Sequence, residues 1–173
     1  MTEIAHPPET LEGWYLSHHV WSVDRRALRA RGHDRAALIA DADAALVHMA
    51  PAAPDGGWSV AFALAGSVGD LMIIHARPTL DAIASAERTL AGAELFDHLR
   101  REYAFLSVTE AGLYHITAQL AKDAAARGGS VGDEQYRAAL DARASSERAS
   151  AHIQRRLYPP LSAEMPYVCF YPM

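Results

Sequence analysis

One feature constrains the fold most: strand-like and helix-like patterns of hydrophobic residues alternate in a fixed order along the first two thirds of the chain. Stretches with a period of two, typical of strands, and stretches with a helical period follow one another as β-α-β-β-α-β. The strand-like stretches are residues 13–23, 58–65, 71–76 and 103–110, and the helical ones are residues 25–49 and 79–90. A short helical turn is also expected at residues 95–102. A chain with this order is expected to form one sheet with two connecting helices.

Turn and capping residues agree with that order. The segment GSVGD at residues 66–70 separates two strand-like stretches and predicts a hairpin. Thr79 follows Pro78 and suits the N-cap of the second helix. We therefore predict an α+β, ferredoxin-like domain over residues 13–114, preceded by an extended arm at residues 1–12.

The last third of the chain adds to this plan. Residues 115–157 are rich in alanine and predict a helical insertion, in which Asp133 suits an N-cap. Residues 158–173 end in YVCFYPM, which is aromatic and apolar and predicts a terminal strand. The fold is thus expected to carry an extra C-terminal helix and edge strand.

Composition excludes several classes of protein. The chain has 173 residues, half of them hydrophobic, and a net charge of −5, so it is neither disordered nor suited to nucleic acid as a main partner. Lys122 is its one lysine. Cys169 is its one cysteine, so an intrachain disulfide is excluded, and a single cysteine fits a reducing compartment. The N-terminus does not read as a signal peptide, and no apolar stretch is long enough to cross a bilayer. We expect a soluble, cytoplasmic protein.

The nine histidines raise the question of a metal site. His18 and His19 are adjacent on a predicted strand, so they point to opposite faces and cannot both bind one ion. The other histidines show no pairing with a carboxylate at helical spacing. A structural role is therefore the favoured interpretation, and no metal ligands are assigned.

Two tyrosines near the C-terminus allow two interpretations. Tyr167 and Tyr171 are four residues apart on the predicted terminal strand and share one face, with Cys169 between them. Composition alone favours packing residues with a hydrated hydroxyl over a catalytic role.

Four segments, taken in order, resemble the chlorite dismutase superfamily and in particular its peroxide-dependent coproheme decarboxylases. They are residues 10–18 (TLEGWYLSH), residues 66–81 ending in RPTLD, residues 155–159 (RRLYP) and residues 167–173 (YVCFYPM). The resemblance covers most of the chain except residues 115–150 or so. It implies a haem-biosynthesis enzyme in which two ferredoxin-like halves form a dimeric α+β barrel, with five subunits in a ring.

The resemblance also implies roles for individual residues. Tyr171 matches a tyrosine that forms a radical and converts a coproheme propionate to a vinyl group. Arg156 matches an arginine that holds a propionate, a task that suits the guanidinium fork. Tyr114 and Met173 match further residues of the substrate site. The family's axial histidine for the haem iron belongs to the second half, which this sequence does not contain.

Three hypotheses follow. The first is one half of a coproheme decarboxylase, which needs a partner chain to supply the axial histidine. The second is a non-catalytic, structural or haem-binding half-barrel subunit. The third is a cofactor-free enzyme that closes its own barrel as a homo-oligomer.

Overall fold

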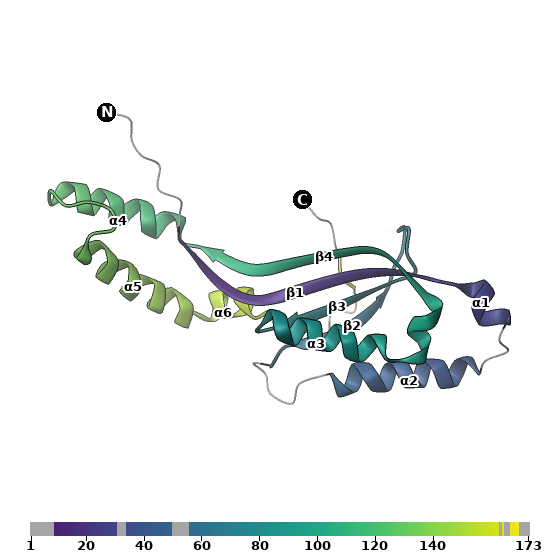
Figure 1. Ribbon diagram of the computed structural model, residues 1–173. Coiled ribbons are helices and arrows are strands. Elements are labelled where there is room, and N and C mark those ends of the chain that lie inside the picture. The colour runs from purple at the N-terminus through teal and green to yellow at the C-terminus, as the bar shows by residue number, and fades with distance from the viewer. Residues whose placement is uncertain (1–8, 31–33, 50–55, 163, 165–166, 170–173) are drawn as a thin grey trace.

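A computed structural model describes residues 9–30, 34–49, 56–162, 164 and 167–169 of the chain. Strands and helices alternate in the predicted order over the first two thirds, and helices follow (Figure 1). The elements are β1 Thr10–Val23, α1 Arg25–Ala30, α2 Arg35–His48, β2 Trp58–Ala63, β3 Leu71–Arg77, α3 Leu80–Ala91, the 3-10 helix η2 Glu94–His98, β4 Leu99–Gly112, α4 Tyr114–Ala126, α5 Glu134–Ala149 and α6 Ala151–Leu157.

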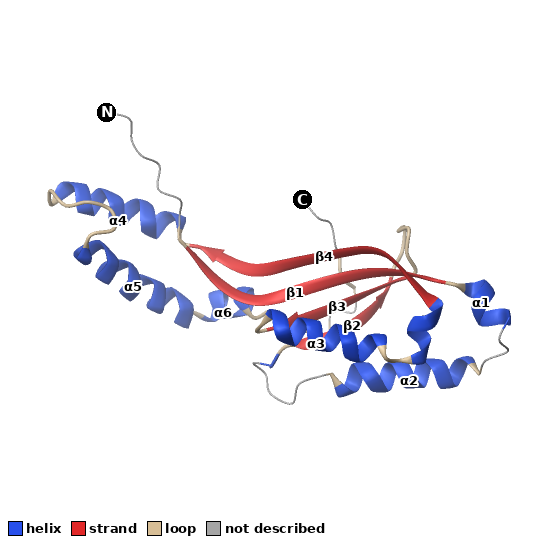
Figure 2. Ribbon diagram, in the orientation of Figure 1, coloured by secondary structure: helices blue, strands red, loops and turns tan. Residues whose placement is uncertain are grey.

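The sheet has the strand order β2-β3-β1-β4, and every neighbouring pair is antiparallel. Figure 2 shows α2 and α3 together on one side of it. The predicted ferredoxin-like α+β plan is confirmed. The predicted N-cap of α3 is also confirmed, since the Thr79 hydroxyl accepts a hydrogen bond from the Ala82 amide.

Within the sheet and its connecting helices, several element boundaries differ from the prediction. The expected helix over residues 25–49 is two helices, and Asp34 caps the second by accepting from the Ala36 amide. β4 begins at Leu99 rather than at residue 103, because β1 pairs with it as far as Val23. β1 also begins earlier than predicted, at Thr10 rather than at residue 13, because Thr10 pairs with Gly112 of β4.

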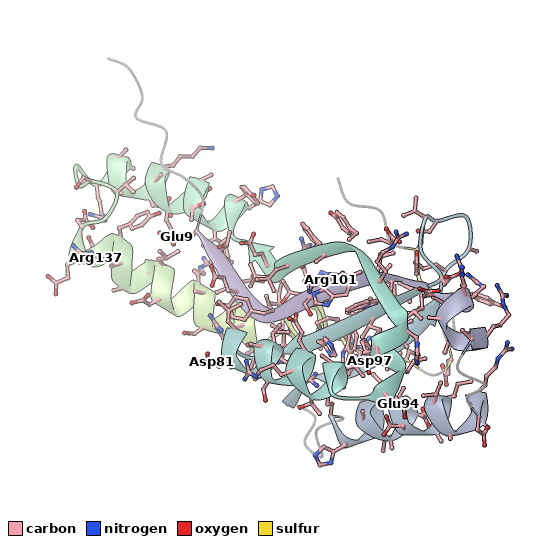
Figure 3. The ribbon with its side chains drawn as sticks, turned by 45° about the vertical axis from the view of Figure 1, so that its right-hand side comes forward. Glu9, Asp81, Glu94, Asp97, Arg101 and Arg137 are labelled. Atoms are coloured by element: carbon pink, nitrogen blue, oxygen red, sulfur yellow. The ribbon has the colours of Figure 1, made fainter. Side chains whose placement is uncertain are left out.

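The last three helices form an appendage at one end of the sheet. Figure 1 shows α4 and α5 as a hairpin that projects beyond β1 and β4, and Arg137 lies near its far end in Figure 3. Asp133 caps α5 through the Tyr136 amide and pairs with Arg127 at 2.7 Å. The helix predicted to run to residue 157 is interrupted at Ser150, whose hydroxyl caps α6. Leu157 at the end of α6 is fully buried against Leu11, Ala111 and Leu113.

The predicted terminal strand is not observed in the residues described. Residues 167–169 pair with no strand of the sheet, and residues 170–173 lie outside the described part of the chain. None of the helices described has the length and apolar character that crossing a membrane requires.

Candidate functional site

The sheet face opposite α3 is apolar. Val20, Met72 and Ile74 are its buried centre, and five partly buried side chains pack around them: Leu16, Trp58, Val60, Phe62 and Leu64. β4 extends this face with Tyr103 and Phe105, which pair with Val20 and His18 and remain 43% and 39% exposed. Two large aromatic side chains at the edge of an apolar sheet form a surface suited to binding a flat apolar molecule or another sheet.

The C-terminal segment runs along this apolar face. The indole Nε1 of Trp58 donates to the Pro159 carbonyl at 2.8 Å, and Trp14 meets Tyr158 edge-on at 5.5 Å between ring centroids. Further on, residues 167–169 and the sheet enclose a pocket of about 830 Å³, and the 66–68 turn forms one end. Val20, Phe62, Leu64 and Met72 supply its apolar lining. Cys169 lines it too, and no histidine is among the described residues that line it.

His18 and His19 occupy opposite faces, as predicted from their adjacency. His18 lies on the apolar face beside the Phe105 ring, at 6.0 Å between ring centroids. Burial lowers its pKa, against an opposing effect from a hydrogen bond with the Phe105 backbone. The imidazole is therefore neutral at pH 7. The sequence predicted only that His18 and His19 lie on opposite faces of the sheet, and it gave no sign of the contact between His18 and Phe105.

Two of the four predicted site residues lie at the far end of β4. Arg156 on α6 is exposed, and its Nε donates to the Glu110 carbonyl at 2.7 Å. Within the described part of the chain its two Nη groups donate no hydrogen bond, so they are available to an anion. Tyr114 begins α4, is 62% exposed, and places its ring against Gly112. The structure thus brings Arg156 and Tyr114 to the last residues of one strand.

The other two predicted residues, Tyr171 and Met173, lie outside the described residues. The segment that leads to them can be placed, because Cys169 and Tyr103 line the same pocket. At about 3.3 Å per residue, Glu110 lies about 20 Å along β4 from Tyr103. Arg156 and Cys169 are therefore at opposite ends of the apolar face.

The helix-covered face holds a buried polar cluster that the sequence did not reveal. Arg77 is 5% exposed and donates to the carbonyls of Trp58, Ala76 and Met49 and to the Ser59 hydroxyl, at 2.5–2.8 Å. The Ser59 hydroxyl also lies 2.8 Å from His75 Nδ1, and the tautomer of the imidazole decides which of the two groups donates. The sequence feature that could have indicated this cluster is the position of Arg77 at the end of the mainly apolar run LMIIHAR.

His75 is neutral because of its surroundings. The side chain is 1% exposed, and burial, followed by the charge of Arg77, lowers its pKa to about 4. The cluster ties β2, β3 and the end of α2 together. No group of three or more histidine, cysteine or acidic side chains suited to a metal ion occurs among the residues described.

Comparisons with known sequences show which family the chain resembles. Residues 35–173 match the family model described as Chlorite dismutase. A protein of Natronomonas pharaonis named "Putative heme-binding protein" is 32% identical over 171 residues, which are 96% of this chain and 25% of that protein. One of the same description from Haloarcula marismortui is 34% identical over 172 residues, 96% of this chain and 23% of the relative. The chain thus spans about a quarter of the length of these curated relatives.

Solved structures show the same fold. A structure described as a novel heme-binding protein from Thermus thermophilus is similar with a TM-score of 0.51 and 26% identity, over 63% of this chain and 45% of that one. A chlorite dismutase variant from Candidatus Nitrospira defluvii gives a TM-score of 0.50 at 18% identity, over 58% and 41% of the two chains. The sheet and its helices therefore correspond to less than half of each of these chains.

Proposed function

The chain belongs to the chlorite dismutase family, and on that premise we propose that it is a haem-binding half-barrel, the first half of a coproheme decarboxylase. The observation that carries the proposal is the apolar sheet face, with its pocket of about 830 Å³. The family match and the haem-binding names of the relatives point to the ligand.

The residues of this face fit a porphyrin. Ligand pockets for small molecules have volumes of about 300–1,000 Å³ and mainly apolar walls with few polar groups. Val20, Phe62 and Met72 offer such a wall, and the ring of Tyr103 can stack on a flat macrocycle. Arg156 lies at the other end, where its free Nη groups suit the bidentate binding of a propionate.

The finer assignment, decarboxylation of coproheme, is supported by the segment YVCFYPM. Coproheme iron together with hydrogen peroxide would supply the two oxidising equivalents that the reaction needs. Tyr171 loses its phenolic hydrogen and then takes one from the propionate Cβ. Loss of CO2 and of one further electron turns the side chain into a vinyl group. Arg156, at the opposite end of the face, would hold a different propionate of the substrate, and Tyr114 and Met173 would border the same substrate.

This proposal requires a second half-barrel, on the same or another polypeptide. Its sheet would pack on the exposed Tyr103 and Phe105, and it would supply the axial histidine, since no histidine is among the described residues that line the pocket. Family relatives are about four times as long as the matched region, which is consistent with further folded parts.

The test is the replacement Tyr171→Phe in the protein joined with its second half. We expect coproheme to bind with an unchanged Soret band, while vinyl formation with peroxide, followed by mass spectrometry, is abolished. Tyr136→Phe is the matched control, because Tyr136 lies on α5, outside the pocket, and its replacement should leave turnover intact. Undiminished vinyl formation in Tyr171→Phe would refute the radical role.

A second candidate is a half-barrel that binds haem without catalysis. It is favoured by the names of the relatives, which state binding and no reaction. The same experiment separates the two, because a non-catalytic subunit binds coproheme and forms no vinyl group even with Tyr171 in place.

A further inference from the structure

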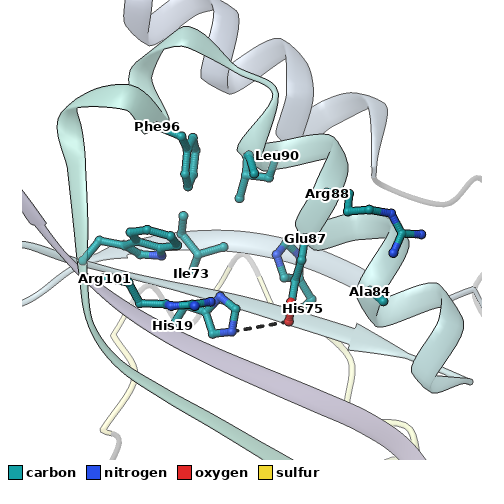
Figure 4. Close-up of a pocket in the computed structure, with 11 residues that line it drawn as sticks. His19, Ile73, His75, Ala84, Glu87, Arg88, Leu90, Phe96 and Arg101 are labelled. Carbon is teal, nitrogen blue, oxygen red and sulfur yellow. Dashed lines mark ion pairs between the residues drawn. The ribbon is translucent and has the colours of Figure 1, made fainter.

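A second pocket, of about 290 Å³, lies on the helix-covered side of the sheet, away from the proposed haem face. It is bounded by α3, by η2 and by strands β1, β3 and β4, and Figure 4 shows the side chains that line it. The volume is near the lower end of those found for ligand pockets, so a ligand would be small.

One end of this pocket is apolar and aromatic. Ile73 forms the floor from β3, and Leu90 and Phe96 approach from the helical side (Figure 4). Trp21 meets Phe96 edge-on, at 5.2 Å between centroids and 87° between planes. These side chains offer a hydrophobic slot for a ring or a branched alkyl group.

The other end carries two opposite charges on either side of one histidine. His19 Nε2 lies 3.4 Å from Glu87 Oε1, and its side chain is 10% exposed. The Arg101 guanidinium lies over the Trp21 ring at 5.9 Å from its centroid and pairs with no carboxylate in the described part of the chain. Trp21 in turn lies 6.0 Å from His19 between ring centroids, and Glu87, His19 and Arg101 all line the same pocket. Burial lowers the pKa of His19, Glu87 opposes this shift, and Arg101 adds to it. Arg88 also lines the pocket, but its side chain points outward from α3 in Figure 4.

We infer that this pocket binds a small zwitterion with an apolar side chain, that is, a free α-amino acid. The carboxylate would pair with Arg101, whose planar fork suits it, and the ammonium group would donate to Glu87. The apolar side chain would occupy the slot between Ile73, Leu90 and Phe96. A simple anion would bring a second negative charge beside Glu87, whose contact in the pocket is His19, and a simple cation would face Arg101. This inference is independent of the proposed haem site, which lies on the other face of the sheet.

The experiment is calorimetric titration of the full chain with three probes of similar shape. They are L-phenylalanine, 3-phenylpropionate, which lacks the ammonium group, and 2-phenylethylamine, which lacks the carboxylate. We expect L-phenylalanine to bind, and each of the other two to bind at least about tenfold more weakly, because each loses one charge-assisted contact. Equal affinity for 3-phenylpropionate, or no binding of L-phenylalanine at millimolar concentration, would overturn the inference.

Two substitutions test whether L-phenylalanine binds in this pocket. Arg101→Gln and Glu87→Gln should each weaken L-phenylalanine binding about tenfold or more. Arg100→Gln is the matched control, because Arg100 is the neighbouring residue on β4 and pairs with Glu102 at 2.6 Å, outside the pocket. Thermal unfolding of each variant checks that the fold persists. L-Phenylalanine affinity that is unchanged in Arg101→Gln would place the ligand elsewhere and refute the site.

Discussion

At the residue scale, the helix-covered face shows how a buried arginine controls a neighbouring imidazole. Arg77 donates to the Ser59 hydroxyl, which in turn lies 2.8 Å from His75 Nδ1. Burial has the largest effect on the pKa of His75 and lowers it, and the charge of Arg77 acts in the same direction. The cluster needs no carboxylate, because three backbone carbonyls accept from Arg77.

This arrangement predicts the pH dependence of stability. The pKa of His75 is about 4 in the folded chain against an ordinary value of 6.5 for a solvated histidine, so the unfolded chain binds more protons between these values. The contribution to the free energy of unfolding is complete above pH 6.5 and is lost as pH falls toward 4. At about 1.4 kcal/mol per pH unit, the loss reaches about 3 kcal/mol.

Urea unfolding between pH 4 and 7 measures this effect. His75→Gln should give a shallower pH profile over that range, because the titrating group is gone. His152→Gln serves as control, since His152 is exposed on α6 and should retain the parent profile. Profiles of equal slope for the parent and His75→Gln would contradict the account.

Arg156 gives a second prediction at this scale. Among the described residues its guanidinium bonds to the Glu110 carbonyl and leaves both Nη groups unbonded, so its removal should cost ligand affinity more than stability. We expect Arg156→Gln to weaken coproheme binding about tenfold in a Soret titration. The neighbouring, equally exposed Arg155→Gln should change affinity little. An Arg156→Gln variant with the parent affinity would show that this arginine does not hold a propionate.

At the scale of elements, hydrophobic periodicity and turn residues predict the β-α-β-β-α-β order. Two interruptions of the predicted helices were not predicted, and both occur at N-cap residues that the sequence contains. Asp34 ends the segment RGHD, and Ser150 lies in an alanine-rich stretch; both side chains cap a new helix. The early start of β4 depends on pairing with β1, which no local pattern reports. The buried Arg77 cluster likewise depends on three elements meeting, so residue spacing alone could not identify it. Nor does residue spacing reveal that Arg156 and the YVC segment lie at opposite ends of one face, since that separation is set by the length of β4.

The contact of α6 with the sheet leads to a prediction about Gly13. A methyl group at this position would collide with the Leu157 carbonyl and with the Thr109 hydroxyl, which itself donates to that carbonyl at 2.6 Å. Gly13→Ala should therefore displace α6 and lower the free energy of unfolding by about 1–3 kcal/mol, as measured by urea unfolding. Gly92→Ala is the control, because its nearest contact would be 3.3 Å away and its φ is not positive. Unchanged stability of Gly13→Ala would mean that α6 does not pack as described.

At the scale of the whole molecule, the sheet has one face covered by its own helices and one apolar face on which we propose that a second half-barrel packs. Neighbouring residues of β4 distinguish the two: Phe105 lies on the apolar face beside His18, and Leu106 lies on the other, with exposures of 39% and 52%. If a second half-barrel packs on the apolar face, Phe105→Lys should abolish its association and the binding of coproheme. Leu106→Lys places the same charge on the opposite face and should preserve both, as sedimentation and Soret titration can show. Equal effects of the two substitutions would contradict the assignment of faces.

The central claim, a haem-binding half-barrel, is tested most directly by native mass spectrometry of the protein purified from its own source without added porphyrin. The account predicts an assembly that contains a second half-barrel, on the same or a partner chain, and a bound mass equal to that of coproheme or haem. An assembly free of porphyrin that also takes up none when coproheme is added would contradict it.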